Sequence, residues 1–220
     1  MASFARQLQP NPSAERTVSG KRQRSAEQHI FVTGACGAGK STLAKALSHQ
    51  VQLPLRRLDD DPDFRQMLPE APWLHRETDP RLYARWQALR RHMVQEALTL
   101  PRPHIIEGTH ILTAPELTTG HRRILVDTPL HQIVRQWLAR DRAKYAEDPL
   151  RYADRDAGLP GSAVARQRAV CARQIYESLR PELDAFRCLP GVEMVPRRAF
   201  NTWLSRQGSS VRWAPASRRA

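Results

Sequence analysis

Short apolar runs alternate with amphipathic segments between residues 29 and 195. The runs are too short for helices, and each ends at Gly, Pro or an acidic residue, which is typical of buried strands. We therefore expect strands at 29–33, 53–58, 104–107, 124–127 and 192–195, of which 53–58 is the weakest.

The segments between these runs have helical spacing. Leu82, Trp86, Leu89, Met93 and Ala97 recur every three or four residues, behind an Asp79-Pro80 start that is typical of a helix N-terminus. Further helices are expected at 40–50, 129–145 and 162–179. Strands that alternate with helices of this length favour right-handed crossovers and a parallel α/β sheet.

Four regions do not have this pattern. Residues 1–28 are polar and aperiodic and are expected to form a disordered basic arm. Residues 196–220 are expected to be a basic C-terminal tail, so the predicted domain covers 29–195. Within it, the Pro- and acid-rich stretch 59–79 and the polar stretch 146–161 are expected to be loops, the second of them mobile.

The net charge of +13 lies mainly in the two ends of the 220-residue chain. Residues 1–28 carry +3 and residues 196–220 carry +6, which leaves +4 for the domain. The ends are expected to be solvated, with contact to nucleic acid or an anionic membrane as the less favoured alternative.

The cellular location of the protein is predicted from the signals that its sequence lacks. No apolar run reaches 18 residues, and the start lacks the apolar core of a secretory signal. Cys36, Cys171 and Cys188 form no CxxC or zinc pattern, which suits free thiols in a reducing compartment. A soluble cytoplasmic protein with no membrane partner is expected, and an Arg- and Ser-rich organelle transit peptide is a minor alternative.

The most specific motif is Gly34-Ala35-Cys36-Gly37-Ala38-Gly39-Lys40-Ser41, which fits the phosphate-binding P-loop pattern between a strand and a helix. Its glycines allow backbone N–H groups to face a phosphate, and the helix N-terminus adds positive potential. Lys40 would contact the β- and γ-phosphates, and the Ser41 hydroxyl would bind Mg²⁺. Residues 34–42, Thr42 included, are therefore predicted to bind ATP, with Mg²⁺ as the second cofactor.

Carboxylates follow two of the other strands. Asp59, Asp60 and Asp61 end the second run and Glu107 ends the third. Ligands of open α/β sheets bind at the carboxyl ends of the strands, so these groups are expected near the phosphates. One of the three aspartates, preferably Asp59, would accept the proton of an attacking hydroxyl, and Glu107 would help to hold Mg²⁺.

Other side chains are candidates for charge stabilisation or substrate contact. Phosphoryl transfer needs positive charge around the moving group, and Arg140 is the preferred catalytic arginine. Arg135 and Arg142, on or just past the same expected helix, are candidate substrate ligands together with Asp60. His110 would touch substrate or make a structural hydrogen bond, and the mobile loop would form a short lid with further arginines.

The order of these motifs resembles the uridine kinase and phosphoribulokinase group of P-loop kinases. The resemblance rests on Gly34–Ser41, Leu58-Asp59, Ile105–Gly108, Val126–Thr128 and the Arg135-to-Asp141 segment. It implies a P-loop NTPase fold of about five parallel strands with helices on both faces, a Mg-ATP donor and a small hydroxyl-bearing acceptor. It also implies that Asp59 is the general base and Arg140 a lid arginine.

The sequence thus predicts a small-molecule kinase that transfers the γ-phosphoryl group of ATP to a nucleoside, a sugar phosphate or a similar metabolite. Asp59 is followed by Asp-Asp-Pro, unlike uridine kinases, so the acceptor's identity stays open, as does the oligomeric state. Within the kinase class, a nucleoside-monophosphate kinase is the alternative. In another class, the alternative is a nucleotide-dependent switch or nucleic-acid-associated NTPase that uses the basic ends.

Overall fold

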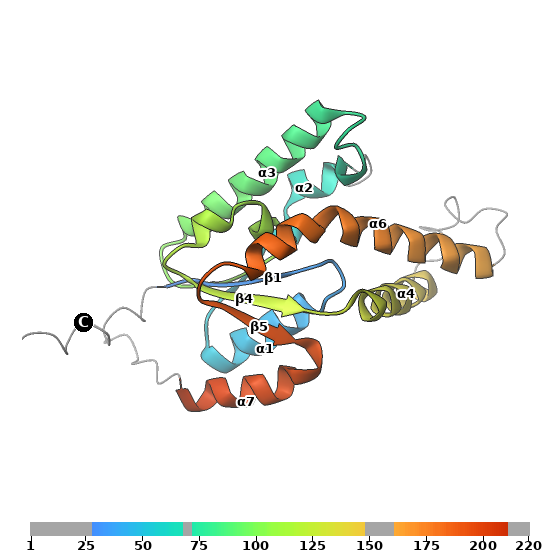
Figure 1. Cartoon of the computed structure of the whole chain (residues 1–220). Coiled ribbons are helices and arrows are strands. Elements are labelled where there is room, and N and C mark those ends of the chain that lie inside the picture. The colour runs from blue at the N-terminus through green and yellow to red at the C-terminus, as the bar shows by residue number, and fades with distance from the viewer. Residues whose placement is uncertain (1–27, 68–71, 148–160, 211–220) are drawn as a thin grey trace, which may run out of the picture.

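A computed structural model describes residues 28–67, 72–147 and 161–210 of the chain. They form a parallel five-stranded sheet in the order β2-β3-β1-β4-β5 (Figure 1). The strands are β1 (Ile30–Gly34), β2 (Leu55–Arg57), β3 (Ile105–Glu107), β4 (Arg122–Asp127) and β5 (Val192–Pro196). All five expected strands are present, and the predicted α/β class is confirmed.

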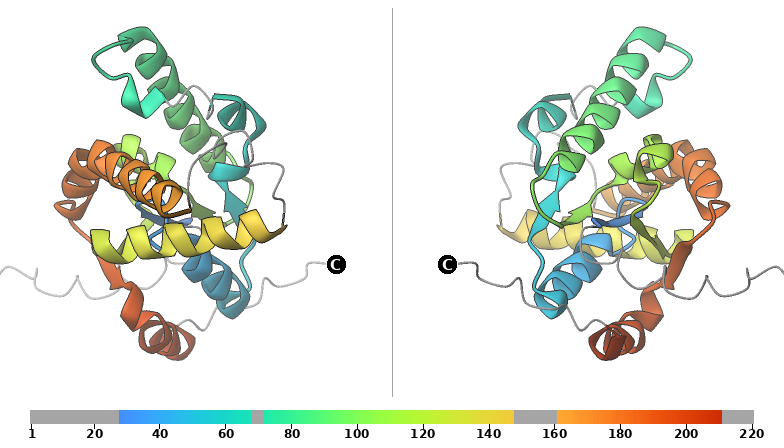
Figure 2. Two further views of the ribbon diagram at one scale, coloured as in Figure 1. Left: turned by 90° about the vertical axis from the view of Figure 1, so that its right-hand side faces the viewer. Right: turned by 90° about the vertical axis from the view of Figure 1, so that its left-hand side faces the viewer.

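Helices cover both faces of this sheet. On one face lie α1 (Lys40–Val51) and α7 (Phe200–Ser210), and on the other lie α3 (Pro80–Leu98) and α6 (Gly161–Arg187), as Figures 1 and 2 show. The helix α4 (Leu130–Glu147) follows β4 and packs along α6 beyond the carboxyl edge of the sheet. None of the helices in the described ranges is long and apolar enough to cross a membrane.

The core is the central part of the sheet and the helix faces against it. Every residue of β1 and β3 is buried, because parallel strands covered on both faces need apolar side chains on both sides. Phe31 and Val32 have no exposed surface, and Leu43 and Leu47 of α1 are equally buried. This core fixes the strand ends that carry the polar residues.

The register brings three chemically important segments to one edge. Val32 of β1 is opposite Glu107 of β3, which is opposite Arg57 of β2. On the other side of β1, Gly34 is opposite Val126. The P-loop after β1 therefore begins beside the acidic ends of β2 and β3.

The stretch 59–79 was wrongly expected to be only a loop. It contains the helix α2 (Pro62–Met67) and two 3₁₀ turns, η1 (Leu58–Asp60) and η3 (Pro72–Leu74), while 68–71 are outside the described residues. Asp61 starts α2, because its Oδ1 accepts the backbone N–H of Asp63 at 3.0 Å and of Phe64 at 3.2 Å. The Asp61-Pro62 pair is the same start signal as Asp79-Pro80.

The C-terminal part is more ordered than the sequence suggested. The helix α6 continues eight residues past the expected end at 179, through Pro181, because Leu183 and Phe186 are buried in the core. Beyond β5, the short turn η6 (Arg197–Ala199) leads into α7, which packs on α1 and buries Phe200. The folded unit therefore extends past 195 to Ser210. Residues 1–27 of the expected arm at 1–28, almost all of the expected lid loop, and residues 211–220 lie outside the described residues.

Candidate active site at the carboxyl edge of the sheet

The P-loop is a tight turn that is held from behind by β4. The N–H of Ala38 donates to the carbonyl of Ala35 at 3.0 Å, and the hydroxyl of Thr128 donates to the Ala38 carbonyl at 2.9 Å. Gly39 precedes α1 with a φ of 97°, where any side chain is strained. A Cβ there would also lie 2.5 Å from the Arg197 guanidinium, which could shift, so the torsion angle is the main reason for glycine at this position. The first backbone N–H groups of α1 have no partner within the helix, so they can bind an anion.

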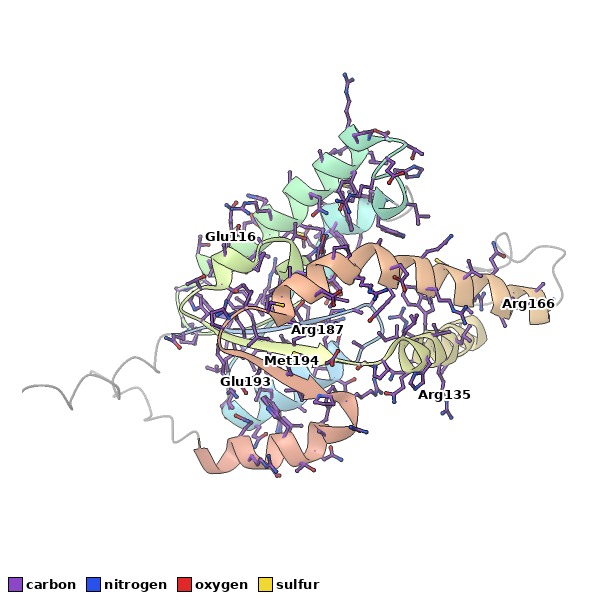
Figure 3. The ribbon with its side chains drawn as sticks, in the orientation of Figure 1. Glu116, Arg135, Arg166, Arg187, Glu193 and Met194 are labelled. Atoms are coloured by element: carbon purple, nitrogen blue, oxygen red, sulfur yellow. The ribbon has the colours of Figure 1, made fainter. Side chains whose placement is uncertain are left out.

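The helix α4 lies against the tip of this loop. A Cβ placed on Gly37 would lie 3.5 Å from Ile133 and 3.9 Å from the Trp137 ring. The Arg140 side chain is exposed. Its guanidinium lies 5.0 Å from the centre of the Trp137 ring, which places it close to the P-loop. Arg135 projects from α4 into solvent (Figure 3), and the Arg142 side chain is outside the described set.

Lys40 is buried between two carboxylates. Its Nζ lies 3.4 Å from Oδ2 of Asp59 and 3.7 Å from Oε1 of Glu107. Burial alone would lower the pKa of Lys40, but the two carboxylates outweigh it and raise that pKa above its ordinary value. Burial would raise the pKa of Asp59, but Lys40 and then His110 hold it well below its ordinary value. Lys40 is therefore cationic and Asp59 anionic at neutral pH.

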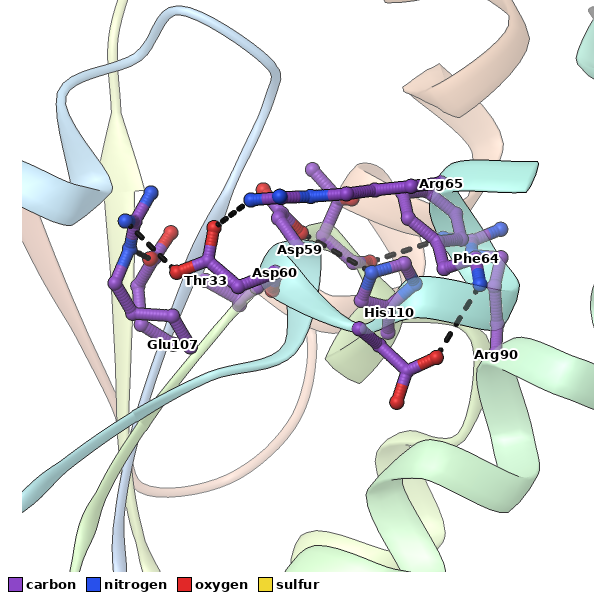
Figure 4. A network of polar contacts seen from close by, with 12 residues as sticks. Thr33, Asp59, Asp60, Phe64, Arg65, Arg90, Glu107 and His110 are labelled. Carbon is purple, nitrogen blue, oxygen red and sulfur yellow. Dashed lines mark hydrogen bonds and ion pairs between the residues drawn. The ribbon is translucent and has the colours of Figure 1, made fainter. Parts of the chain in front are cut away.

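The three consecutive aspartates have three different environments. Asp59 faces Lys40, and its side chain keeps 27% of its surface exposed. Asp60 points to the other side, where it pairs with Arg57 at 2.9 Å and Arg65 at 2.6 Å (Figure 4). Asp61 caps α2. Only Asp59 of the three is placed next to the P-loop lysine, whereas the proposed substrate ligand Asp60 already has two arginine partners.

Glu107 has the properties of a metal-binding carboxylate. Its side chain is fully buried, and its Oε1 has no well-aligned hydrogen bond among the described residues. The Ser41 hydroxyl interacts with this carboxylate, and Arg57 Nε lies 3.4 Å from Oε2. Burial raises the pKa of Glu107, opposed chiefly by Lys40. A carboxylate oxygen that has no well-aligned hydrogen bond and lies beside a hydroxyl suits Mg²⁺, a hard cation that also takes nucleotide oxygens. No group of three or more His, Cys, Asp or Glu side chains in the described ranges is arranged to hold a metal alone.

His110 is inside the protein rather than on the surface. Its ring is fully buried in η4 (Thr109–Thr113), and its Nε2 lies 3.1 Å from Oδ1 of Asp59 (Figure 4). The two atoms are at hydrogen-bonding distance but are not well aligned for a hydrogen bond, and neither has a well-aligned hydrogen bond to any other described residue. Burial lowers the pKa of His110, against the opposing effect of Asp59. The imidazole is thus neutral beside a carboxylate.

The structure reveals a buried arginine that the sequence reasoning missed. Arg90 of α3 has no exposed surface and makes two contacts to Glu182 of α6, at 2.8 and 3.1 Å. It also donates to the Thr109 carbonyl at 2.9 Å and lies 4.5 Å from the Trp86 ring. Its place four residues after Trp86, on the apolar face of the helix, was the available signal. Arg57 and Arg65 were also missed, since nothing local shows that they flank Asp60.

The remaining predicted residues are less involved. Thr42 follows Ser41 on α1, where its side chain is exposed. None of the three cysteines is in a disulfide, and burial raises the pKa of Cys36, which keeps it protonated within the P-loop. Residues 34–41 together with Asp59, Glu107 and His110 therefore form one cluster, while Thr42 and Arg135 face solvent.

Two comparisons with known proteins give similarities, and a third gives none. A family model described as Zeta toxin matches residues 14–104, less than half of the chain. No curated protein matches this chain. Among solved structures, a shikimate kinase from Bacteroides thetaiotaomicron is 18% identical, with a TM-score of 0.52 over 84% of this chain and 98% of that one.

Two further solved structures are less similar. A shikimate kinase from Acinetobacter baumannii, in complex with shikimate, is 12% identical over 85% of this chain and 96% of that one, with a TM-score of 0.48. A gluconokinase from Sinorhizobium meliloti is 14% identical over 84% and 95%, with a TM-score of 0.45. With the strand order and the P-loop, the likeness to the first shikimate kinase shows that this chain has the P-loop kinase fold.

Proposed function

We propose that this protein is an ATP-dependent kinase that transfers the γ-phosphoryl group to a hydroxyl of a small metabolite. The observation that carries the proposal is the placement of the Asp59 carboxylate 3.4 Å from Nζ of the P-loop Lys40, with part of its surface open to solvent. A base next to the phosphate-binding lysine is what transfer to a hydroxyl requires. The small-molecule kinases that share this fold support the same activity.

ATP would bind along residues 34–42. The N–H groups of the loop and of the first turn of α1 would hold the phosphates, and Lys40 would neutralise charge on the β- and γ-phosphates. In the structure, Lys40 is neutralised by Asp59 and Glu107 instead. Bound phosphates would take over part of this pairing, which leaves Asp59 free to turn to the acceptor.

Ser41 and Glu107 would hold Mg²⁺ together with nucleotide oxygens. The ion would neutralise charge that develops on the transferred group. This role suits the buried Glu107, because the pKa of this carboxyl is raised in the absence of a bound cation, and a divalent cation would favour its ionised form.

Asp59 would accept the proton of the acceptor hydroxyl as the oxygen attacks phosphorus. Its low pKa keeps it ionised at neutral pH, and the exposed 27% of its side-chain surface gives the hydroxyl access. Arg140, which lies on Trp137 near the P-loop tip, is the proposed arginine that stabilises charge on the moving group.

The acceptor would bind on the β2–α2 side of Asp59. Here Arg57 and Arg65 flank Asp60, which makes the surroundings strongly polar. We propose a nucleoside, a sugar phosphate or a similar polyhydroxylated metabolite, as in the uridine kinase and phosphoribulokinase group. The solved structures support the broader P-loop kinase fold rather than that group in particular.

The test is ADP formation from Mg-ATP across a panel of nucleosides, nucleotides, sugar acids and sugar phosphates. One acceptor should stimulate turnover and gain the mass of one phosphoryl group. Lys40→Ala should lower that turnover by at least about a thousandfold, because charge stabilisation at the phosphates is lost. Lys45→Ala, on the exposed face of the same helix, is the matched control and should stay within about twofold.

Two results would contradict the proposal. Equal turnover of Lys40→Ala and wild type would show that the P-loop lysine does not act on ATP. Hydrolysis that RNA or DNA stimulates, with a steep dependence on salt, would instead favour a nucleic-acid-associated NTPase.

A further inference from the structure

We propose that His110 is a positioning residue that holds the Asp59 carboxylate through an Nε2–H donor, with one oxygen fixed and the other turned toward Lys40 and the acceptor. The inference rests on the proposed function of Asp59 as the base. It goes beyond that function because it gives a specific task to a side chain that substrate does not reach in the structure: His110 has no exposed surface.

The two oxygens of Asp59 have different neighbours. Oδ1 lies 3.1 Å from Nε2 of His110, and Oδ2 lies 3.4 Å from Nζ of Lys40 (Figure 4 shows the His110 contact). The Oδ1–Nε2 contact is at hydrogen-bonding distance without being well aligned in the structure. A hydrogen bond formed there would limit rotation of the carboxylate. The second oxygen then faces the P-loop, where the phosphoryl group would be transferred.

The imidazole is neutral because of what surrounds it. Burial is the main reason that the pKa of His110 is lowered; the Asp59 carboxylate opposes it, and the charges of Arg90 and Lys40 add to it. The edge of the Phe64 ring packs against the imidazole, with the centroids 4.2 Å apart and the planes at 83°. A neutral ring whose Nε2 faces a carboxylate carries its proton on Nε2, since a lone pair there would repel the oxygen.

The backbone around His110 is itself fixed. A Cβ on Gly108 would lie 3.0 Å from Leu58 Cβ, 3.1 Å from the His110 ring and 3.3 Å from Oδ1 of Asp59. The φ of Gly108 is 166°, so glycine is needed here for space and not for its torsion angle. The Thr109 carbonyl is held by Arg90, which is paired with Glu182. The ring therefore sits on a rigid support that extends from α6.

This support becomes more important once phosphates occupy the P-loop. Lys40 would then share its charge with the nucleotide and bind Asp59 less strongly. His110 would be the contact that continues to stabilise the ionised carboxylate, because a hydrogen bond to the charged form favours that form. Its loss should therefore affect turnover and its pH dependence more than ATP binding.

The experiment compares His110→Leu with His110→Gln in the acceptor-stimulated reaction. Leucine fills the space without a donor, whereas the glutamine amide places an N–H near the position of Nε2. His110→Leu should lower kcat about 10- to 100-fold, leave KM for ATP within about twofold and move the acid limb of the kcat profile to higher pH. His110→Gln should restore most of kcat and the wild-type acid limb. Equal losses in both variants, or a change in KM alone, would overturn the proposal.

A second measurement does not depend on turnover. In ¹⁵N-histidine NMR of the full chain, His110 is assigned by the signal that His110→Gln removes. It should stay neutral and in the Nε2–H form at pH values below the ordinary histidine pKa. Protonation near the ordinary histidine pKa, or an Nδ1–H form, would overturn the proposal. If no acceptor is ever phosphorylated, the proposed function fails, and the NMR result still decides whether His110 holds Asp59.

Discussion

At the amino edge of the sheet, His29, His104 and His121 precede three neighbouring strands, whereas at the carboxyl edge His110 lies against Asp59. At the amino edge, histidine rings accept hydrogen bonds from the backbone. Nδ1 of His121 accepts the N–H of His29, and Nδ1 of His29 accepts the N–H of His104, both at 3.2 Å. These histidines connect strand ends and form part of the scaffold.

The carboxyl edge is different because buried polar atoms there lack such partners. Oδ1 of Asp59, Oε1 of Glu107 and both ring nitrogens of His110 have no well-aligned hydrogen bond within the described residues. Buried polar groups without well-aligned hydrogen bonds cost free energy even where they face an opposite charge, so they indicate a region shaped for something other than stability. The same residue type is structural at one edge and, as we propose, part of an active site at the other.

Among the changes considered, Asp59→Asn at the carboxyl edge should have the largest effect, and that effect is on kcat. The amide keeps the size of the side chain but cannot accept the proton of the acceptor hydroxyl, so kcat should fall about 10²- to 10⁴-fold. Asp63→Asn, on the exposed side of α2, is the matched control and should stay within about twofold. Steady-state kinetics with the identified acceptor gives both values. A mild effect at Asp59 would remove the base from the mechanism.

Glu182→Ala tests how far the carboxyl edge depends on the helix α6. It leaves the Arg90 guanidinium buried without its carboxylate, which should lower the free energy of unfolding by about 3–5 kcal/mol. Glu177→Ala on the same helix removes only an exposed contact to Arg180 and should change the free energy of unfolding by about 0.5 kcal/mol or less. Urea unfolding at pH 7.5 measures both. Similar values for the two variants would show that the buried pair does not support η4.

At the amino edge, the histidines should make the stability of the protein depend on pH. Burial lowers the pKa of His29 and of His121, and neighbouring histidines add to the effect at His29. The folded protein therefore binds fewer protons than the unfolded chain, so stability is complete above pH of about 6.5 and falls as the pH drops below it. Each lost acceptor should cost about 1 kcal/mol.

Urea unfolding between pH 7.5 and 5 measures this decline. In the double variant with His29→Asn and His121→Asn, the amide oxygens can still accept the backbone N–H groups but do not titrate. The variant should lose less stability than wild type over the same range. An equal decline in both proteins would place the titration elsewhere, with the buried His110 as the next group to test.

The local pattern of the chain was enough to predict much of this molecule. The apolar runs, the Asp79-Pro80 start and the P-loop motif each lie within a few residues, and these short-range signals predicted the parallel sheet, α1, α3 and α4. The helix α2 could also have been predicted, because Asp61-Pro62 is a start signal of the same kind. The helix α7 was missed because composition, not periodicity, was used to classify 196–220.

What the sequence determined by itself is the fold class and the P-loop, since both follow from the order of residues along a short stretch. Tertiary structure decided which of three adjacent aspartates meets Lys40, and that Arg57 and Arg65 pair with Asp60. It also decided that His110 is buried against Asp59 and that Arg90 is paired with Glu182, 92 positions away. Such contacts depend on the parallel register and on helix packing, which bring together residues that no local pattern relates.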